Sequence, residues 1–235
     1  MGSEPGAPVA LVTGSNRGSG LAIARGLLAA GYRVRSLNRT PLGDPDLGEL
    51  PCDLADAGAV VAATGRVVEE EGGLDLCVAN AVDRVFTPVA QMSAADWDRQ
   101  VAVNLSSVFH LARTALPALR ARRGLFVVMG SHAATHYFEG GAAYSATKAA
   151  LKGLVETLLL EERPHGVRAC LLSPGAIANF DDDTAPTKIT TDSVGRFVAD
   201  LVTRMPADLV VGEVEFRPAR LPGAPVAGID RLLHV

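Results

Sequence analysis

Short apolar segments rich in β-branched residues alternate with longer segments of helical periodicity, and this alternation constrains the fold most. The expected strands are Val9–Thr13, Arg33–Leu37, a stretch near Leu50, Leu74–Ala79, Leu125–Met129, Val167–Leu172 and Val210–Phe216. The expected helices are Gly20–Ala30, Ala57–Glu71, Ser93–Arg123, Ala142–Arg163 and Asp192–Arg204. Such alternation is typical of repeated βαβ units. It predicts an α/β fold, a single doubly wound domain with a parallel sheet of about seven strands flanked by helices.

The helix boundaries carry recognisable local patterns. Every predicted helix is followed by Gly or Pro, residues that stop helices. Ser93 has the form of an N-cap, with Asp96 at the third helical position. Pro117 lies inside the predicted helix Ser93–Arg123, so a kink or break is expected near Thr114–Leu116.

Composition excludes several classes of function. The chain has 235 residues and a formal charge of −4 with no concentrated basic segment, so no nucleic-acid partner is expected. Cys52, Cys77 and Cys170 are odd in number and widely spaced, which predicts buried free thiols in a reduced, cytoplasmic protein without a metal. No segment resembles a signal peptide or a membrane span, so no membrane partner is expected.

A glycine-rich turn follows the first predicted strand directly and runs into an apolar helix. Glycines allow a tight turn there and let backbone N–H groups approach a pyrophosphate, which the positive end of the helix stabilises. Because strand, turn and helix agree, the segment predicts a Rossmann-like dinucleotide site rather than a plain structural turn. The expected cofactor contacts are Gly14, Ser15, Asn16, Arg17, Gly18, Ser19 and Gly20.

The residues after the second predicted strand indicate which dinucleotide binds. NAD-binding folds place a carboxylate there for the ribose 2′-hydroxyl, whereas this chain has Asn38 and Arg39. Arg39 and Arg17 would hold a 2′-phosphate, which favours NADP(H); two ordinary surface arginines are the alternative. Asp53, after the short third strand, would accept a hydrogen bond from the adenine amino group or cap the next helix, and the sequence favours neither.

Tyr144 and Lys148 stand four residues apart in a predicted helix, so both side chains lie on one face. The pKa of a free phenol is near ~10, and a nearby ammonium would lower it towards the range useful for proton transfer. Ser131, after the fifth predicted strand, would hydrogen-bond a substrate carbonyl. Asn104 is an amide in an otherwise apolar helix, and binding a backbone carbonyl and a water near Lys148 would satisfy it.

From Thr13 to Gly175 the order and spacing of these motifs resemble the classical short-chain dehydrogenase/reductase family. The resemblance rests on the glycine-rich turn, Asp53, Asn80-Ala81, the tetrad of Asn104, Ser131, Tyr144 and Lys148, and Pro174-Gly175. It implies an NADP(H)-dependent oxidoreductase that reduces a ketone or aldehyde to an alcohol, or the reverse, with Tyr144 as general acid or base. Lys148 would also hold the nicotinamide ribose, Ser131 would orient the carbonyl, and Asn104 would position a water. The further cofactor contacts it implies are Leu54, Asn80, Ala81, Pro174, Gly175, Ile177 and Asn179, besides Tyr144 and Lys148.

Several positions depart from the family pattern. The usual Asn-Asn-Ala-Gly is Ala79-Asn80-Ala81-Val82 here, which removes one amide and places Val82 at a glycine position. Ser19 replaces an aliphatic residue, and Asn179 replaces the Thr that commonly follows Pro174-Gly175. The catalytic groups remain, so the departures indicate tuning of cofactor fit; a weakened enzyme is the alternative.

Substrate specificity is expected from loops at the carboxyl ends of the strands, residues 82–86, 132–139 and 176–191. The predicted pocket residues in these loops are Ala133, His136, Glu139 and Phe180. The two longest apolar helices would pair across a two-fold axis, which predicts a homodimer or homotetramer. Residues 1–8 are expected to be disordered and residues 9–235 to form a single NADP(H)-binding catalytic domain.

Two other classes of function stay open. A sensor or scaffold that binds NADP(H) without turnover would have no need of the tetrad, which this chain retains. An epimerase or dehydratase of the same family would use the cofactor without net consumption, but an appended sugar-nucleotide domain is not expected in so short a chain. The favoured prediction is a reductase or dehydrogenase acting on a small-molecule carbonyl or alcohol.

Overall fold

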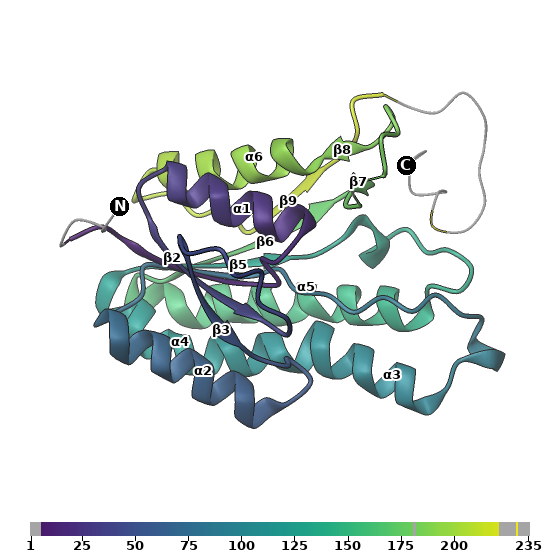
Figure 1. Cartoon of the computed structure of the whole chain (residues 1–235), viewed down its shortest axis with the longest axis horizontal. Helices are drawn as coiled ribbons and strands as arrows, with labels where there is room; N and C mark the ends of the chain where they lie inside the picture. The colour runs from purple at the N-terminus through teal and green to yellow at the C-terminus, as the bar shows by residue number, and fades with distance from the viewer. Residues whose placement is uncertain (1–5, 181, 221–228, 230–235) are drawn as a thin grey trace.

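The computed structural model describes residues 6–180, 182–220 and 229, and its centre is a parallel sheet (Figure 1). The strand order is β3-β2-β1-β4-β5-β6-β9, and every neighbouring pair is parallel. The strands are β1 (Val9–Thr13), β2 (Arg33–Asn38), β3 (Leu47–Pro51), β4 (Leu76–Ala79), β5 (Leu125–Met129), β6 (Arg168–Pro174) and β9 (Glu213–Phe216). A small parallel pair, β7 (Ile177–Ala178) and β8 (Ile189–Thr190), lies outside this sheet. The predicted α/β, Rossmann-like fold with seven parallel strands is confirmed.

Helices cover both faces of the sheet. Figure 1 shows α1 (Gly18–Ala29) and α6 (Thr191–Arg204) on one face, and α2 (Ala57–Glu71), α3 (Ala94–Val101), α4 (Ser107–Arg122) and α5 (Ala142–Glu162) on the other. Side chains of β1 alternate between the two cores: Leu11 packs on the α2, α4 and α5 side, and Val12 on the α1 and α6 side. Because both faces are covered, the strand must be apolar throughout, as its sequence is.

The predicted N-cap and Gly stops form as expected, and one predicted helix divides. The Ser93 hydroxyl accepts a hydrogen bond from the Asp96 backbone N–H at 3.0 Å, and Gly72 ends α2 in the left-handed region. The predicted helix Ser93–Arg123 is α3, a π-helical turn at Ala102–Ser106 and α4. A π turn inserts one extra residue into the helical ladder, a feature common at functional sites.

The break expected at Pro117 is wrong. Helix α4 continues through Pro117 to Arg122. Pro117 removes one backbone hydrogen bond, but Leu111, Ala115 and Leu119 on the same helix are almost completely buried against the sheet. Packing of this apolar face therefore outweighs the local cost of the proline.

The strand order reverses between β1 and β4, so the carboxyl ends of these two strands open onto the same crevice. Asn80, directly after β4, donates its backbone N–H to Thr13 Oγ1 at 3.0 Å and its amide Nδ2 to the Thr13 carbonyl at 3.1 Å. This is the point at which ligands bind in open parallel sheets, and it fixes where the site is built.

Other expectations concern buried thiols and the chain ends. Cys52, Cys77 and Cys170 are buried and free, and burial raises the pKa of Cys52 to about 11 and that of Cys170 to about 12.

In the segment 1–8 expected to be disordered, residues 1–5 lie outside the described residues. Of the helices that the structure describes, none has the length and hydropathy needed to cross a membrane.

Candidate active site

The structure brings the predicted tetrad together from three separate segments. Ser131 follows β5, Tyr144 and Lys148 lie on α5, and Asn104 lies in the π turn before α4. Ser131 lies close enough to Tyr144 for its hydroxyl to lower the pKa of the phenol. Lys148 Nζ donates to the Met129 carbonyl at 2.6 Å. A serine after β5 and a tyrosine and a lysine from the following helix thus meet at the carboxyl end of β5.

Asn104 holds the backbone of the segment after β4. Its Nδ2 donates to the Asp83 carbonyl at 2.9 Å, and its Oδ1 accepts the Asp83 backbone N–H at 2.7 Å. The same Nδ2 lies 3.3 Å from Thr147 Oγ1 on α5. The backbone carbonyl that the sequence predicted as a partner is therefore that of Asp83, and Asn104 positions this loop against α5.

Burial dominates the electrostatics of Tyr144 and Lys148. Burial raises the pKa of Tyr144, and the Ser131 hydrogen bond and the charge of Arg84 offset this only in part. Burial and the charge of Arg84 lower the pKa of Lys148 from its ordinary value of 10.5 to about 7. The expectation that Lys148 lowers the pKa of Tyr144 is not met, because the buried ammonium is itself destabilised.

The glycine-rich turn has the shape of a cradle. Gly14 and Gly18 have φ values of 66° and 56°, which favour glycine. A Cβ built on Gly20 would lie 2.0 Å from the Gly14 carbonyl oxygen and 2.4 Å from Asn80 Nδ2. Helix α1 begins here, and its N-cap, Arg17, makes no side-chain capping bond. The first backbone N–H groups of α1 therefore suit an anion such as a pyrophosphate.

Asn179 reaches this cradle from the other side of the crevice. Its Oδ1 accepts the Ser19 backbone N–H at 3.0 Å, so it satisfies one donor of the helix N-terminus. Pro174 ends β6, Gly175 donates its N–H to the Phe216 carbonyl at 2.8 Å, and Ile177 begins β7. The predicted contacts after β6 are thus placed opposite the turn, across 160 residues of sequence.

Asn38 makes contacts within the protein that the sequence did not predict. Asn38 is buried, accepts the Ser15 backbone N–H at 2.7 Å and donates to Glu49 Oε1 at 2.8 Å. Burial raises the pKa of Glu49, but hydrogen bonds from three backbone N–H groups and Asn38 outweigh it, so the pKa is lowered. Glu49, on β3, is a carboxylate near the second strand that motif reasoning missed. No local sequence pattern indicated that Glu49 would pair with Asn38 across the sheet.

The two predicted phosphate-binding arginines are placed differently. Arg39 is exposed, and within the described segments it has no ion pair. Arg17 lies with its guanidinium carbon 5.7 Å from the centroid of the Phe180 ring. Asn16 donates to the Thr40 carbonyl at 3.1 Å, which ties the turn to the segment carrying Arg39.

The structure shows that Asp53 does not cap the next helix. The N-cap of α2 is Asp56, which accepts the Ala59 N–H at 3.1 Å. Asp53 instead accepts the Ala55 N–H at 3.0 Å and lies 3.4 Å from the guanidinium of Arg99. Leu54, beside it, is buried in the core.

The predicted pocket residues Ala133, His136 and Glu139 have different surroundings. Ala133 is fully buried, donates its N–H to Ser131 Oγ at 3.1 Å and packs with Phe138 and Tyr144. The His136 ring lies against the His132 ring at a tilt of 50°, with ring centroids 3.9 Å apart. Glu139 lines a surface hollow of about 490 Å³ beside Phe138.

Phe86 and Arg84 extend the site beyond the predicted residues. The Phe86 ring meets the Tyr144 ring edge to face, with centroids 5.7 Å apart. The guanidinium of Arg84 lies 5.5 Å from the Phe180 ring centroid, and its charge acts on both Tyr144 and Lys148. Both fall within the expected loop 82–86, but no motif pointed to either as a site residue.

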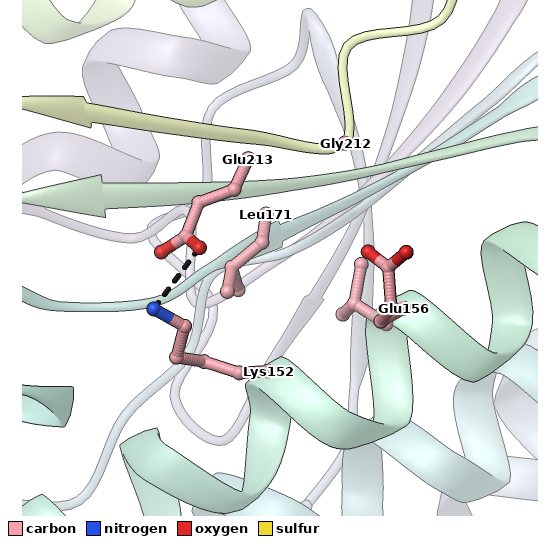
Figure 2. Close-up of a pocket in the computed structure, with 6 residues that line it drawn as sticks. Lys152, Glu156, Leu171, Gly212 and Glu213 are labelled. Carbon is pink, nitrogen blue, oxygen red and sulfur yellow. Dashed lines mark ion pairs between the residues drawn. The ribbon is translucent and has the colours of Figure 1, made fainter.

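A second hollow lies away from this cluster. Figure 2 shows Lys152 on α5 reaching across to the Glu213 carboxylate on β9, an ion pair of 3.0 Å. These two residues line a cavity of about 260 Å³ with Val155, Glu156, Leu171 and Gly212. None of its lining residues belongs to the tetrad or the glycine-rich turn, so hydrogen-bond geometry, rather than surface concavity, locates the site.

Comparison with known proteins places this arrangement in a family. A family model described as short chain dehydrogenase matches residues 8–187. The chain belongs to the short-chain dehydrogenase/reductase family. Within this family, D-threitol dehydrogenase of Mycolicibacterium smegmatis is 33% identical over 181 residues, 72% of this chain and 70% of the relative. The 3-oxoacyl-(acyl-carrier-protein) reductase MabA of Mycobacterium tuberculosis is 28% identical over 226 residues, 95% of this chain and 83% of the relative.

Solved short-chain dehydrogenases/reductases share the fold. An alcohol dehydrogenase of the archaeon Thermococcus sibiricus, complexed with 5-hydroxy-NADP, has a TM-score of 0.83 at 27% identity and covers 92% of this chain and 99% of its own. A metagenomic short-chain oxidoreductase in complex with NADP has a TM-score of 0.79 at 32% identity and covers 91% of this chain and 98% of its own. The family is one of oxidoreductases, and these members bind NADP or a derivative of it.

Proposed function

We propose that this protein is an NADP(H)-dependent oxidoreductase that interconverts a small-molecule ketone or aldehyde and an alcohol. The observation that carries the proposal is the meeting of Ser131, Tyr144 and Lys148 at the carboxyl end of β5, with Lys148 Nζ 5.9 Å from the centroid of the Tyr144 ring, together with the cradle at the N-terminus of α1. Membership of an oxidoreductase family supports it. The catalytic unit spans residues 9–235, with substrate loops at 82–86, 132–139 and 176–191, and assembles as a homodimer or homotetramer through α4 and α5.

The residues present fit the cofactor. The glycine positions leave room for close approach of a pyrophosphate, and the free N–H groups of α1 and the exposed Arg39 supply positive charge. Asn80, Ala81 and Asn179 lie against the glycine-rich turn, where they would contact the bound cofactor. When bound, NADPH supplies the hydride and NADP⁺ accepts one.

The chain's own residues position the carbonyl and move the proton. Ser131 and Tyr144 donate hydrogen bonds to the carbonyl oxygen, and Tyr144 transfers the phenolic proton to it during reduction. A raised pKa keeps Tyr144 protonated in the neutral pH range, so it acts as an acid. Lys148, anchored at the Met129 carbonyl, holds the cofactor ribose, and Asn104 keeps the loop after β4 in place.

A direct test mixes the purified protein with NADPH and a panel of ketones and aldehydes and follows absorbance at the nicotinamide band. Oxidation of NADPH that depends on a carbonyl is expected. Saturable NADPH binding without oxidation by any carbonyl would favour the alternative of a sensor or scaffold. Interconversion of a substrate with no net change in NADPH would favour an epimerase or dehydratase.

The Arg39→Ala variant tests the preference for NADPH over NADH. Because Arg39 is exposed and unpaired within the described segments, its removal should leave the fold intact and take away a charge-assisted contact to the 2′-phosphate. We expect the dissociation constant for NADPH to rise by roughly tenfold to a hundredfold while that for NADH changes little. Equal weakening of both, measured by fluorescence titration, would contradict the 2′-phosphate assignment.

A further inference from the structure

Arg84 lies on a backbone segment that is fixed on both sides by the catalytic helices. The Asp83 N–H and carbonyl are both held by Asn104. The Val85 carbonyl accepts a hydrogen bond from Gln100 Nε2 at 3.1 Å, and Gln100 is fully buried. The following residue, Phe86, packs its ring against that of Tyr144. A loop tied down at each neighbouring residue holds Arg84 in a defined position beside the reacting group.

Acidic residues on the segments that carry Arg84 and Phe180 are paired with other cations. Asp83 pairs with Arg99 at 3.2 Å, and Asp183 pairs with Lys188 at 2.7 Å. Across the residues that the structure describes, Arg84 has neither a hydrogen bond nor a carboxylate partner, although its side chain is half-buried. Its one recorded contact is the face of the Phe180 ring. A half-buried guanidinium of this kind lacks the anion that normally compensates it.

The surroundings of Arg84 indicate which molecule would carry such an anion. Arg84 is two residues from Phe86, whose ring meets the Tyr144 ring with centroids 5.7 Å apart, so the segment that carries Arg84 borders the phenol. Phe86 and Phe138, whose ring centroids are 5.3 Å apart, form an apolar wall beside the phenol. A molecule whose carbonyl meets Tyr144 therefore has an apolar surface on one side and a fixed cation on another.

We propose that Arg84 binds a carboxylate of the substrate, so that this protein acts on oxo acids or hydroxy acids rather than on neutral carbonyl compounds. The inference rests on the proposed oxidoreductase function and names the substrate class of the same site. Arg84 offers a planar pair of N–H donors that suits a carboxylate. The Tyr144 hydroxyl then meets the oxo group, and the distance between the two groups selects the position of the oxo group along the acid.

The test compares each oxo acid with its own primary amide, which has the same shape and no charge. Pyruvate, 3-oxobutanoate and 4-oxopentanoate are assayed with NADPH beside their amides. We expect kcat/KM for at least one acid to exceed that for its amide by roughly tenfold or more, the range of a charge-assisted hydrogen bond. In Arg84→Gln this ratio should fall to near one through loss of the acid's kcat/KM, while turnover of the amide is retained. Arg196→Gln, at an exposed arginine on α6, is the matched control and should keep the wild-type ratio.

A binding measurement keeps the inference separate from the proposed function. Acetate, propionate and benzoate are titrated calorimetrically into the protein loaded with NADP⁺, where no turnover is needed. Wild type and Arg196→Gln should bind at least one of them, and Arg84→Gln should bind it roughly tenfold or more weakly. The inference is overturned if no carboxylate binds wild type, if Arg84→Gln keeps the acid preference, or if Arg84→Gln weakens NADPH as much as the acid. The last outcome would assign Arg84 to the phosphates of the cofactor. Failure to oxidise NADPH with any carbonyl would refute the proposed function and leave this binding result to decide the role of Arg84.

Discussion

The glycine-rich turn at residues 13–20 and the loop at residues 80–88 lie at the carboxyl ends of neighbouring strands, yet they are held in different ways. The turn owes its path to its own glycines, with left-handed φ at Gly14 and Gly18, and to the start of α1, although Asn38 and Asn179 also accept backbone N–H groups from it. The loop is held by side chains from distant segments, chiefly Asn104 and Gln100. A site formed by local backbone geometry can be found from a motif, whereas a site held by tertiary contacts cannot.

The largest effect is expected at Tyr144, which packs against the loop through Phe86. Tyr144→Phe removes the proton donor and keeps the ring that packs against Phe86. We expect kcat/KM to fall by about a hundredfold to ten-thousandfold, the usual contribution of a positioned general acid. The dissociation constant for NADPH should stay within about twofold. A variant that keeps most of its activity would show that Tyr144 is not the acid.

Gly20→Ala acts first on the turn, and in the loop it meets the side chain of Asn80. The added Cβ would lie 2.0 Å from the Gly14 carbonyl oxygen, so the backbone of the turn must move. We expect roughly a tenfold or larger loss of NADPH affinity, because the N–H groups of the turn no longer converge. Gly65→Ala on α2 is the control, since its Cβ meets nothing within 4 Å and Ala stabilises a helix by about 0.5–1 kcal/mol. Equal NADPH affinity in the two variants would contradict the role of the turn.

Asn104→Ala breaks the loop and spares the turn. It leaves the Asp83 N–H and carbonyl without their partner and frees the segment that carries Arg84 and Phe86. We expect the KM for the carbonyl substrate to rise and kcat to fall, together by roughly tenfold, with a smaller change in NADPH binding. Asn104→Asp restores an acceptor for the Asp83 N–H and should recover part of the loss. If NADPH binding suffers more than carbonyl turnover, the loop does not position the substrate.

The smallest effect concerns stability and pH. The pKa of Lys148 is about 7 in the folded protein and 10.5 as its ordinary value, so between these values the unfolded chain binds the proton and the folded chain releases it. The free energy of unfolding should therefore rise as the pH increases from about 7 towards 9, and Lys148→Met should flatten this rise. Lys152→Met, one turn further along α5, is the control. Denaturant titrations at a series of pH values measure the slope, and an unchanged slope in Lys148→Met would refute the assignment.

Local patterns predicted local structure well. The Ser93 cap, the Gly72 stop, the strand and helix order and the spacing of Tyr144 and Lys148 depend on residues within a few positions of one another. Pro117 was misjudged because its local cost is real but smaller than the packing of its helix on the sheet. The N-cap of α2 is Asp56 and not Asp53. The two positions are about one turn apart, and local propensity does not distinguish between them.

The sequence by itself determined the parallel α/β fold, because periodicity encodes it, and it predicted the dinucleotide cradle and the tetrad from the order of motifs that resembles the family. Tertiary structure alone decided that Asn104 clamps Asp83, that Glu49 engages Asn38 and that burial sets the pKa values of Tyr144 and Lys148. It also decided that Arg84 lies in the loop that packs on Tyr144 through Phe86, without an acidic partner in the described segments. The reason is physical: burial and charge compensation depend on which distant segments meet, and that is settled only when the sheet has assembled.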